Sequence, residues 1–207
     1  MEIITHLTPF HYIEIKNLYT KEEKKEMLIE MMYLGKNNKL RSPEETGSAS
    51  NDGVFLKQNK GVFIDEVYSD RRFSDILRLN RRPLHILFGK THNTPEPTTL
   101  TDSWIFNNIE LNSDTTLLSY YEDGDYYEAH RDTAMVTIID WNYLEPKNFT
   151  GGDLIFPYYD NHTIKVSLTS TYVFISNIAH YVSPIKIIDK GIKQSGRFSL
   201  ACFGQPQ

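Results

Sequence analysis

The sequence predicts a mostly β protein with flanking helices, and two observations carry this prediction. From residue 104 onward, short runs rich in β-branched and aromatic residues follow one another, separated by turn residues. Strands at such regular spacing are typical of an antiparallel sandwich or barrel. Residues 1–103 instead contain two stretches in which apolar residues recur at helical spacing. We therefore expect two helices that pack on an all-β core.

The N-terminal region is expected to contain one strand, two helices and polar connections. Residues 10–18 alternate between polar and apolar and predict a strand. Thr20 and Glu23 form a capping-box pattern, so a helix should start there and run to Gly35. Its apolar stripe is formed by methionines and a leucine: Met27, Leu28, Met31 and Met32. Residues 36–52 read as a loop and 54–64 as short extended segments.

A second helix is expected over residues 65–81, followed by a proline-containing loop over 91–102. This helix region is decorated with arginines, namely Arg71, Arg72, Arg78, Arg81 and Arg82. They form either a solvated face or a patch for an acidic partner.

The region after residue 103 is expected to be a succession of strands. The predicted runs are 104–111, 115–121, 126–132, 135–142, 152–156, 163–168, 172–176, 181–188 and 197–203. We expect a single domain over 1–207, with residues 1–103 as a support region and 104–203 as the β core.

Charge and composition exclude several classes of protein. The net charge is −5, so a global basic field is absent and no nucleic-acid partner is expected. A single cysteine, Cys202, excludes a disulfide framework and a cysteine-based metal site, so any metal must be held by nitrogen and oxygen. Residues 1–9 lack the apolar run of a signal peptide, and no stretch could span a membrane. We expect a soluble cytoplasmic protein of undetermined oligomeric state.

Three residues have the composition of a metal site. Residues i and i+2 of a strand point to one face, so His130 and Asp132 can converge on one metal ion. His180 follows directly on the run 172–179, which begins as a strong β segment. Two histidines and one carboxylate form the facial triad of non-haem iron(II) oxygenases, which leaves coordination positions open. A structural histidine at a strand edge is the alternative for His180 taken alone, and a chance His-x-Asp pair is the alternative for His130 and Asp132.

Arg197 and Ser199 begin the last predicted strand on one face, while Phe198 takes the other face. An arginine on an otherwise buried strand is costly unless an anion neutralises it, and a guanidinium suits a carboxylate.

Four motifs together resemble the iron(II)/2-oxoglutarate-dependent dioxygenases, in particular their prolyl 4-hydroxylase branch. The segment 121–132 is similar to that branch's Tyr-x-x-Gly-x-x-Tyr-x-x-His-x-Asp block. Three further segments follow in the family's order: Gly-Gly-Asp-Leu-Ile-Phe at 151–156, His-Tyr-Val-Ser-Pro at 180–184 and Arg-Phe-Ser at 197–199. The resemblance implies a double-stranded β-helix, a jelly-roll or cupin-like core, with the N-terminal helices packed on it.

The resemblance also implies roles for individual residues. Iron(II) would be held by His130, Asp132 and His180, and 2-oxoglutarate and O2 would complete the site. The far carboxylate of 2-oxoglutarate would pair with Arg197, assisted by Ser199 and the Tyr121 hydroxyl. The branch's second tyrosine corresponds to Tyr127, a candidate for the substrate mouth, where packing is an equal alternative. Ascorbate would support the iron, and the face of Trp141 stays open.

Two departures from the family pattern bear on these roles. The basic residue of the family follows the distal histidine by about ten positions, which is where Lys190 lies, whereas Arg197 is 17 positions after His180. We prefer Arg197, because Asp189, Lys190 and Gly191 read as a hairpin turn that points to water. The connector after Asp132 is also short, which leaves the substrate class open.

The expected activity is hydroxylation of a peptide or protein side chain, with proline as the candidate residue and succinate and CO2 as co-products. Two alternatives stay open: a hydroxylase of a free amino acid or other small molecule, and a non-catalytic jelly-roll binding module.

Overall fold

A computed structural model describes residues 1–46, 50–89 and 100–206. Its helices are α1 (Lys21–Lys36), α2 (Ile64–Val67), α3 (Asp75–Leu79), α4 (Arg82–Phe88) and α5 (Trp104–Asn107), with 3-10 turns η1 (Pro43–Glu45) and η2 (Arg71–Phe73). Its strands are β1 (Glu2–His6), β2 (Tyr12–Lys16), β3 (Ser50–Asn51), β4 (Val54–Phe55), β5 (Lys57–Gln58), β6 (Lys60–Phe63), β7 (Ser113–Tyr121), β8 (Tyr126–His130), β9 (Val136–Asn142), β10 (Phe149–Gly151), β11 (Leu154–Phe156), β12 (His162–Ile164), β13 (Ser170–Ile175), β14 (His180–Val182), β15 (Ile185–Ile187) and β16 (Arg197–Gln205).

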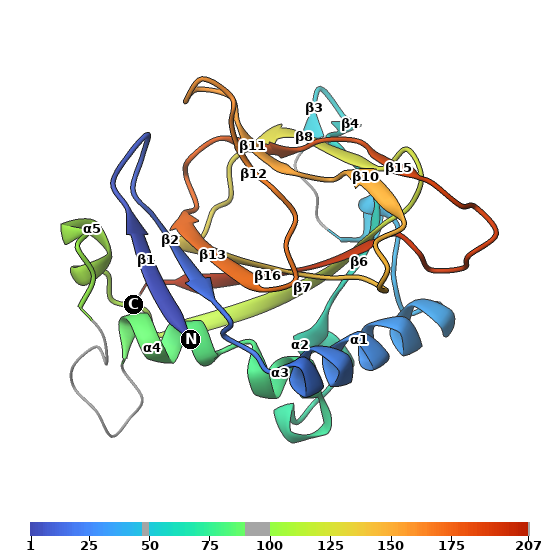
Figure 1. Ribbon diagram of the computed structural model, residues 1–207, viewed down its shortest axis with the longest axis horizontal. Coiled ribbons are helices and arrows are strands. Elements are labelled where there is room, and N and C mark those ends of the chain that lie inside the picture. The colour runs from blue at the N-terminus through green and yellow to red at the C-terminus, as the bar shows by residue number, and fades with distance from the viewer. Residues whose placement is uncertain (47–49, 90–99, 207) are drawn as a thin grey trace.

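Two antiparallel sheets face each other. The larger has the strand order β1-β2-β13-β9-β16-β7-β6, and the smaller has the order β12-β11-β14-β8-β5. Figure 1 shows the smaller sheet above the larger one, helices α1 to α4 below the larger one, and α5 at the left beside β1. This arrangement confirms the predicted mostly β fold with helices packed on one side.

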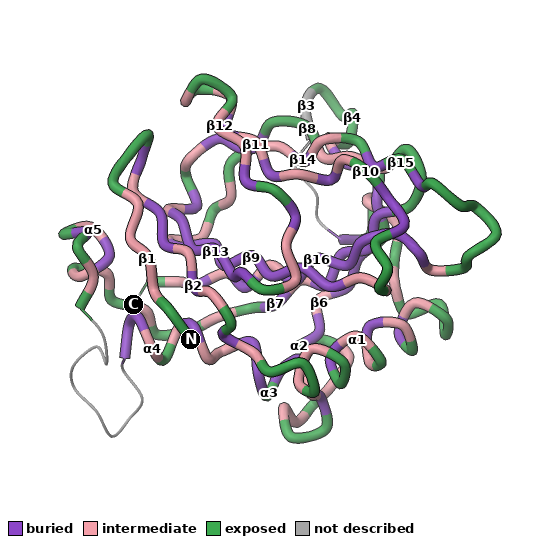
Figure 2. Tube along the Cα trace, viewed as in Figure 1, coloured by how far each residue is buried: buried purple, intermediate pink, exposed green. Residues whose placement is uncertain are grey.

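The side chains of the large sheet alternate between two cores. On β16, Phe198 and Leu200 pack against α1 and α3, while Arg197, Ser199 and Ala201 face the space between the sheets. This alternation matches the faces that the sequence predicts. Figure 2 shows the buried chain concentrated in β13, β9 and β16, which have a packed layer on each side. The inter-sheet core is rich in aromatic residues, among them Phe10, Trp141, Phe156 and Phe174.

Helix α1 confirms the capping-box prediction. The Thr20 hydroxyl accepts a hydrogen bond from the Glu23 amide at 3.1 Å, and the Glu23 carboxylate accepts one from the Thr20 amide at 2.9 Å. Met27, Met31 and Leu34 form its buried face. Within residues 1–46, 50–89 and 100–206, no helix is long and apolar enough to cross a membrane.

The predicted helix over 65–81 is wrong in its continuity, because the segment breaks into α2, η2 and α3. Asp70 and Ser74 adopt extended conformations, and their side chains cap the turns that follow. Glu30 of α1 holds the second break, since its carboxylate accepts hydrogen bonds from the Ser74 hydroxyl (2.7 Å) and the Ile76 amide (3.0 Å). Local capping and a tertiary contact therefore override helical periodicity.

Other differences follow from contacts that are distant in sequence. The predicted strand at 104–111 begins instead with α5, where the Asn107 side chain bonds Thr101 and closes the turn. The predicted hairpin around Lys190 is not one, because β15 pairs with β10 whereas β16 pairs with β7 and β9. Strand β1 was not predicted. Of the expected loops, residues 47–49 and 91–99 lie outside the described residues.

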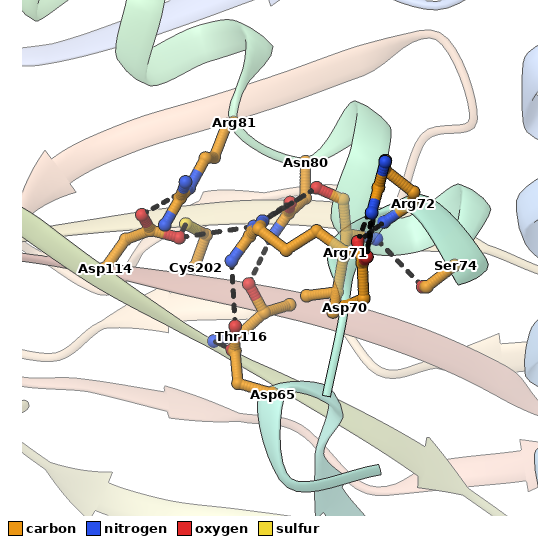
Figure 3. Close-up of polar contacts among 11 residues, drawn as sticks. Asp65, Asp70, Arg71, Arg72, Ser74, Asn80, Arg81, Asp114, Thr116 and Cys202 are labelled. Carbon is orange, nitrogen blue, oxygen red and sulfur yellow. Dashed lines mark hydrogen bonds and ion pairs between the residues drawn. The ribbon is translucent and has the colours of Figure 1, made fainter. Parts of the chain in front are cut away.

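The arginines of the 65–82 region are paired with carboxylates rather than free to form a patch for an acidic partner. Figure 3 shows Arg71 reaching Asp65 and Arg81 reaching Asp114, at 2.8 and 2.6 Å. Arg72 pairs with Asp70, and Arg78 with Asp75. These pairs fasten the helical segments to each other and to β7, which favours the solvated-face alternative.

The ion pair between Glu23 and Arg82 joins α1 to α4, with two N–O contacts of 2.5 and 2.9 Å. The hydrogen bond from Arg82 lowers the pKa of Glu23 from 4.5 to about 2. A depressed carboxyl pKa stabilises the fold above the unfolded value and ceases to do so as the pH falls through the folded value. We expect Glu23→Gln to lower the free energy of unfolding by about 1 kcal/mol at pH 7. In urea titrations, this deficit should shrink between pH 5 and pH 2 (about the two pKa values). A constant deficit across that range would contradict the assignment.

Candidate active site

Two neighbouring strands of the small sheet place the two histidines opposite each other. His130 ends β8, His180 begins β14, and the two residues are direct partners in the antiparallel register. Their ring centroids are 4.4 Å apart, and both side chains are buried. Residues 50 positions apart in sequence thus share one wall of the inter-sheet space.

The backbone sets the tautomer of each histidine. The Nδ1 atom of His130 lies 2.8 Å from the Glu128 carbonyl oxygen, and Nδ1 of His180 lies 2.8 Å from the Ile178 carbonyl oxygen. A carbonyl only accepts, so each Nδ1 carries the proton and donates it. In the neutral form of each ring the lone pair is then on Nε2, which is the form that binds a metal.

Asp132 completes the cluster. Its carboxylate oxygens lie 3.5 Å from the Nε2 atoms of His130 and His180, and one ligand atom from each residue falls within 4.8 Å of the others. The Thr137 hydroxyl donates to Asp132 Oδ2 at 2.7 Å and orients the carboxylate. Within the described ranges this is the single cluster of at least three such side chains that could hold a metal ion.

The site has the charge state that a metal requires. Burial alone would raise the pKa of Asp132, but contacts with His130, His180 and Thr137 outweigh burial and hold the pKa below its usual value. Burial lowers the pKa of His180 to about 4, although Asp132 opposes the shift. At neutral pH the cluster therefore offers a carboxylate and a neutral His180 imidazole.

Arg197 lies in the same inter-sheet space. It is 1% exposed, and its Nη1 donates to the Gly152 carbonyl oxygen at 2.6 Å. Its Nε and Nη2 atoms are buried without a hydrogen-bond partner among the residues that the structure describes. Burial lowers the pKa of Arg197 to about 10, so the side chain stays cationic at neutral pH.

Trp141 adds a further unpartnered donor. Its Nε1 is buried without a hydrogen-bond partner in the described part of the chain, and its ring centroid is 5.9 Å from Arg197 Cζ. Both residues line a cavity of about 60 Å³ that is also lined by His130, Asp132 and His180. Buried donors normally have acceptors, so this set needs an explanation. A ligand carboxylate supplies one, because its oxygens accept from several donors at once.

The Gly-Gly turn at 151–152 is needed for this geometry. Both glycines have positive φ, and a Cβ on Gly151 would lie 2.1 Å from the Pro184 carbonyl oxygen. A Cβ on Gly152 would lie 2.9 Å from the Ile185 side chain. Glycine therefore lets the turn approach β15 closely and bring the Gly152 carbonyl to Arg197.

The other candidate residues are also located. Tyr121, Ser199 and Tyr127 line the cavity. The ring of Tyr121 lies 4.3 Å from Arg197 Cζ, and burial raises the pKa of this tyrosine to about 12, so its hydroxyl keeps its proton. The ring of Tyr127 stacks on His130 with a centroid distance of 3.6 Å. Lys190, in contrast, has a side chain 73% exposed and pairs with Asp123 at 2.5 Å.

The sequence left the face of Trp141 open and gave no sign of two buried polar residues, Lys57 of β5 and Asn59 between β5 and β6. Strand β9 is buried along its whole length, so hydrophobic alternation carries no signal about the face of Trp141. The stretch Leu-Lys-Gln-Asn-Lys-Gly at 56–61 has the polar composition of an exposed turn.

Comparison with solved structures shows which proteins share this fold. A prolyl-4-hydroxylase from Pseudomonas putida superposes with a TM-score of 0.62 over 95% of this chain and 92% of that one, at 15% identity. A prolyl hydroxylase from Trichoplax adhaerens, in complex with a hypoxia inducible factor peptide fragment, gives 0.64 over 94% and 83%, at 14% identity. The viral collagen prolyl hydroxylase of Paramecium Bursaria Chlorella virus-1, in its 2OG complex, gives 0.55 over 93% and 94%, at 13% identity.

No protein-family model and no curated protein matches the sequence. The three superpositions nevertheless show that the chain has the fold of the prolyl hydroxylases, which confirms the fold implied by the four motifs.

Proposed function

We propose that the protein is an Fe(II)- and 2-oxoglutarate-dependent dioxygenase that hydroxylates a peptide or protein side chain, with proline as the candidate residue. Succinate and CO2 are the co-products. Residues 1–207 act as one catalytic domain, in which the β core carries the site and the N-terminal region supports it. The peptide in the Trichoplax adhaerens complex supports a peptide substrate by analogy of fold.

One observation carries the proposal: the cluster of His130, Asp132 and His180 lines the same cavity as Arg197 and Trp141. The latter two residues have buried nitrogens without hydrogen-bond partners among the described residues. The donor set fits the two groups that the reaction requires. His130, Asp132 and His180 offer the two nitrogens and one oxygen typical of non-haem iron(II) oxygenases. When bound, iron and 2-oxoglutarate supply the oxidising chemistry, and the protein supplies positioning.

The chain's own residues divide this work. The backbone carbonyls of residues 128 and 178 orient the two imidazoles, and Thr137 orients Asp132. In the same cavity, Arg197, Trp141 and the protonated Tyr121 present donors to the far carboxylate, and Ser199 assists them. Tyr127, which stacks on His130, is the candidate residue for the substrate mouth.

The proposal is tested by turnover. We expect iron-dependent conversion of 2-oxoglutarate to succinate, with ascorbate present to keep the iron reduced, and one added oxygen in a proline-containing peptide by mass spectrometry. Oxygen in a free amino acid, with peptides unchanged, would favour the small-molecule alternative. If the protein shows neither tight iron binding nor succinate formation, the non-catalytic module is the alternative that remains. That alternative does not explain why Arg197 stays buried with two unpaired nitrogens.

Trp141→Phe tests the cosubstrate end. The change keeps the aromatic packing and removes only the indole N–H, which should raise the KM for 2-oxoglutarate about tenfold and leave kcat nearly unchanged. The matched control is Trp104→Phe, because Trp104 is 70% exposed on α5. That control protein also leaves Trp141 as its sole tryptophan, so its fluorescence should respond to 2-oxoglutarate. An unchanged KM in Trp141→Phe, with no fluorescence response in the control, would remove Trp141 from the site.

We also propose a cytoplasmic location. The single cysteine, Cys202, is buried and free, so the fold does not depend on an oxidising compartment.

A further inference from the structure

The segment that crosses from the small sheet to the large one holds two buried polar side chains. Lys57 is 5% exposed and Asn59 is 4% exposed, while Gln58 and Lys60 between and after them are exposed. This alternation places Lys57 and Asn59 on the same, inward face of the segment. Neither the metal site nor the cosubstrate site proposed above uses these two residues.

Their inward face is beside the metal cluster. Lys57 is the register partner of Tyr127 on β8, and its Nζ lies 5.8 Å from the Tyr127 ring centroid. The same ring stacks on His130, with a centroid distance of 3.6 Å. Asn59 precedes β6, whose Gly61 pairs with Ser119 of the cavity wall. Lys57 therefore lies beside Tyr127, whereas the register that pairs Lys60 with Tyr120 places Asn59 next to Tyr121, the strand partner of Arg197.

Among the described residues, the Asn59 amide has no hydrogen-bond partner and the Lys57 ammonium has no ion pair. Both amide atoms of Asn59 are buried without a hydrogen-bond partner among residues 1–46, 50–89 and 100–206. Burial alone lowers the pKa of Lys57 to about 8, with no carboxylate contributing, so the amine is still mainly protonated at neutral pH. The contact of Lys57 with the Tyr127 ring offsets only part of the cost of desolvating an ammonium, and no carboxylate supplies the rest.

We propose that Lys57 forms a substrate-anchoring site beside Tyr127, a residue of the metal-cavity wall, and that the substrate presents a carboxylate to Lys57, with the unpartnered Asn59 amide farther along the same face. The inference rests on the proposed function and names its substrate class: a molecule with a carboxylate close to the carbon that is hydroxylated. Asn59 supplies one donor and one acceptor, which matches a neighbouring amide or peptide unit. The Lys57 ammonium gains the counter-ion that the protein itself does not provide.

This chemistry has three sources, and matched probes separate them. The first pair is a proline peptide with Asp or Asn after the proline, and the second is a peptide ending at proline with a free or an amidated C-terminus. The third pair is L-proline and L-prolinamide. Binding of each probe to the metal-free protein is measured by saturation-transfer NMR at pH 7. We expect the carboxylate member of at least one pair to bind about tenfold more tightly than its amide partner.

Variants assign the preference to the residue. Lys57→Met keeps much of the side-chain volume, and it should lower the affinity for the carboxylate probe to that for its amide partner. Lys57→Arg should keep the preference for the carboxylate probe. Lys60→Met is the matched control, because Lys60 lies on the exposed face of the same segment. Thermal unfolding of each variant establishes that it is folded, and Lys57→Arg carries the test if Lys57→Met is not.

Three outcomes would overturn the proposal: no carboxylate preference or no binding in all three pairs, a preference that survives Lys57→Met, or displacement of the preferred probe by 2-oxoglutarate. The last would assign Lys57 to the cosubstrate. Because binding is measured without iron, the outcome is separate from turnover. Carboxylate binding without succinate formation would leave this site standing and remove the proposed function, and turnover without carboxylate preference would do the reverse.

Discussion

Alanine at His130, Asp132 or His180 is expected to abolish iron binding and to lower succinate formation by at least about a hundredfold. That magnitude is a lower bound, because loss of a residue that merely orients a metal ligand already costs 10- to 100-fold. The three side chains would bind one metal ion together. A double variant should therefore lose no more iron binding or succinate formation than the most damaging single variant. Calorimetric titration with Fe(II) under anaerobic conditions measures binding, and succinate formation measures turnover.

The control for this series is His85→Ala, since His85 is exposed on α4, outside the cavity. Iron affinity and turnover should match those of the unmodified protein. Iron binding that survives Asp132→Ala and both histidine changes would place the metal elsewhere and end the proposal.

Arg197→Met is expected to have opposite effects on cosubstrate binding and on stability. Without the guanidinium, the far carboxylate loses a charge-assisted contact in a buried site, and the KM for 2-oxoglutarate should rise about a hundredfold or more. The ligand-free protein, however, no longer buries a cation with two unpaired nitrogens. Its free energy of unfolding should therefore rise by about 1 kcal/mol or more.

Lys190→Ala is the discriminating control. It removes a lysine at the spacing typical of the family, but the Lys190 side chain is exposed and pairs with Asp123 at the surface. We expect its KM and stability to be unchanged, and Arg197→Lys to bind 2-oxoglutarate with intermediate affinity. A large rise in KM only for Lys190→Ala would show that the cosubstrate carboxylate binds at the other basic residue.

The parts of the fold that the sequence predicts correctly depend on short-range chemistry. The Thr20–Glu23 cap needs only two side chains three residues apart, and it starts α1 as expected. The alternation at Arg197 and Phe198 needs only a strand, and the two side chains face different cores. The helix expected over 65–81 fails because Glu30, far away in sequence, accepts hydrogen bonds from the residues at its second break.

For the candidate site, the sequence by itself determined the chemical set: two histidines, one carboxylate and one arginine in an order typical of one dioxygenase branch. Spacing and residue type carry that information, because i and i+2 on a strand share a face wherever the strand goes. Only the tertiary structure decided that the indole of Trp141 joins Arg197, and that Lys57 is buried while Lys60 is exposed. Strand β9 is buried on both faces, and a lone lysine in a polar turn gives no periodic signal. The environments of Trp141 and Lys57 therefore depend on which strands lie next to them, and the local sequence pattern does not predict pairing between distant strands.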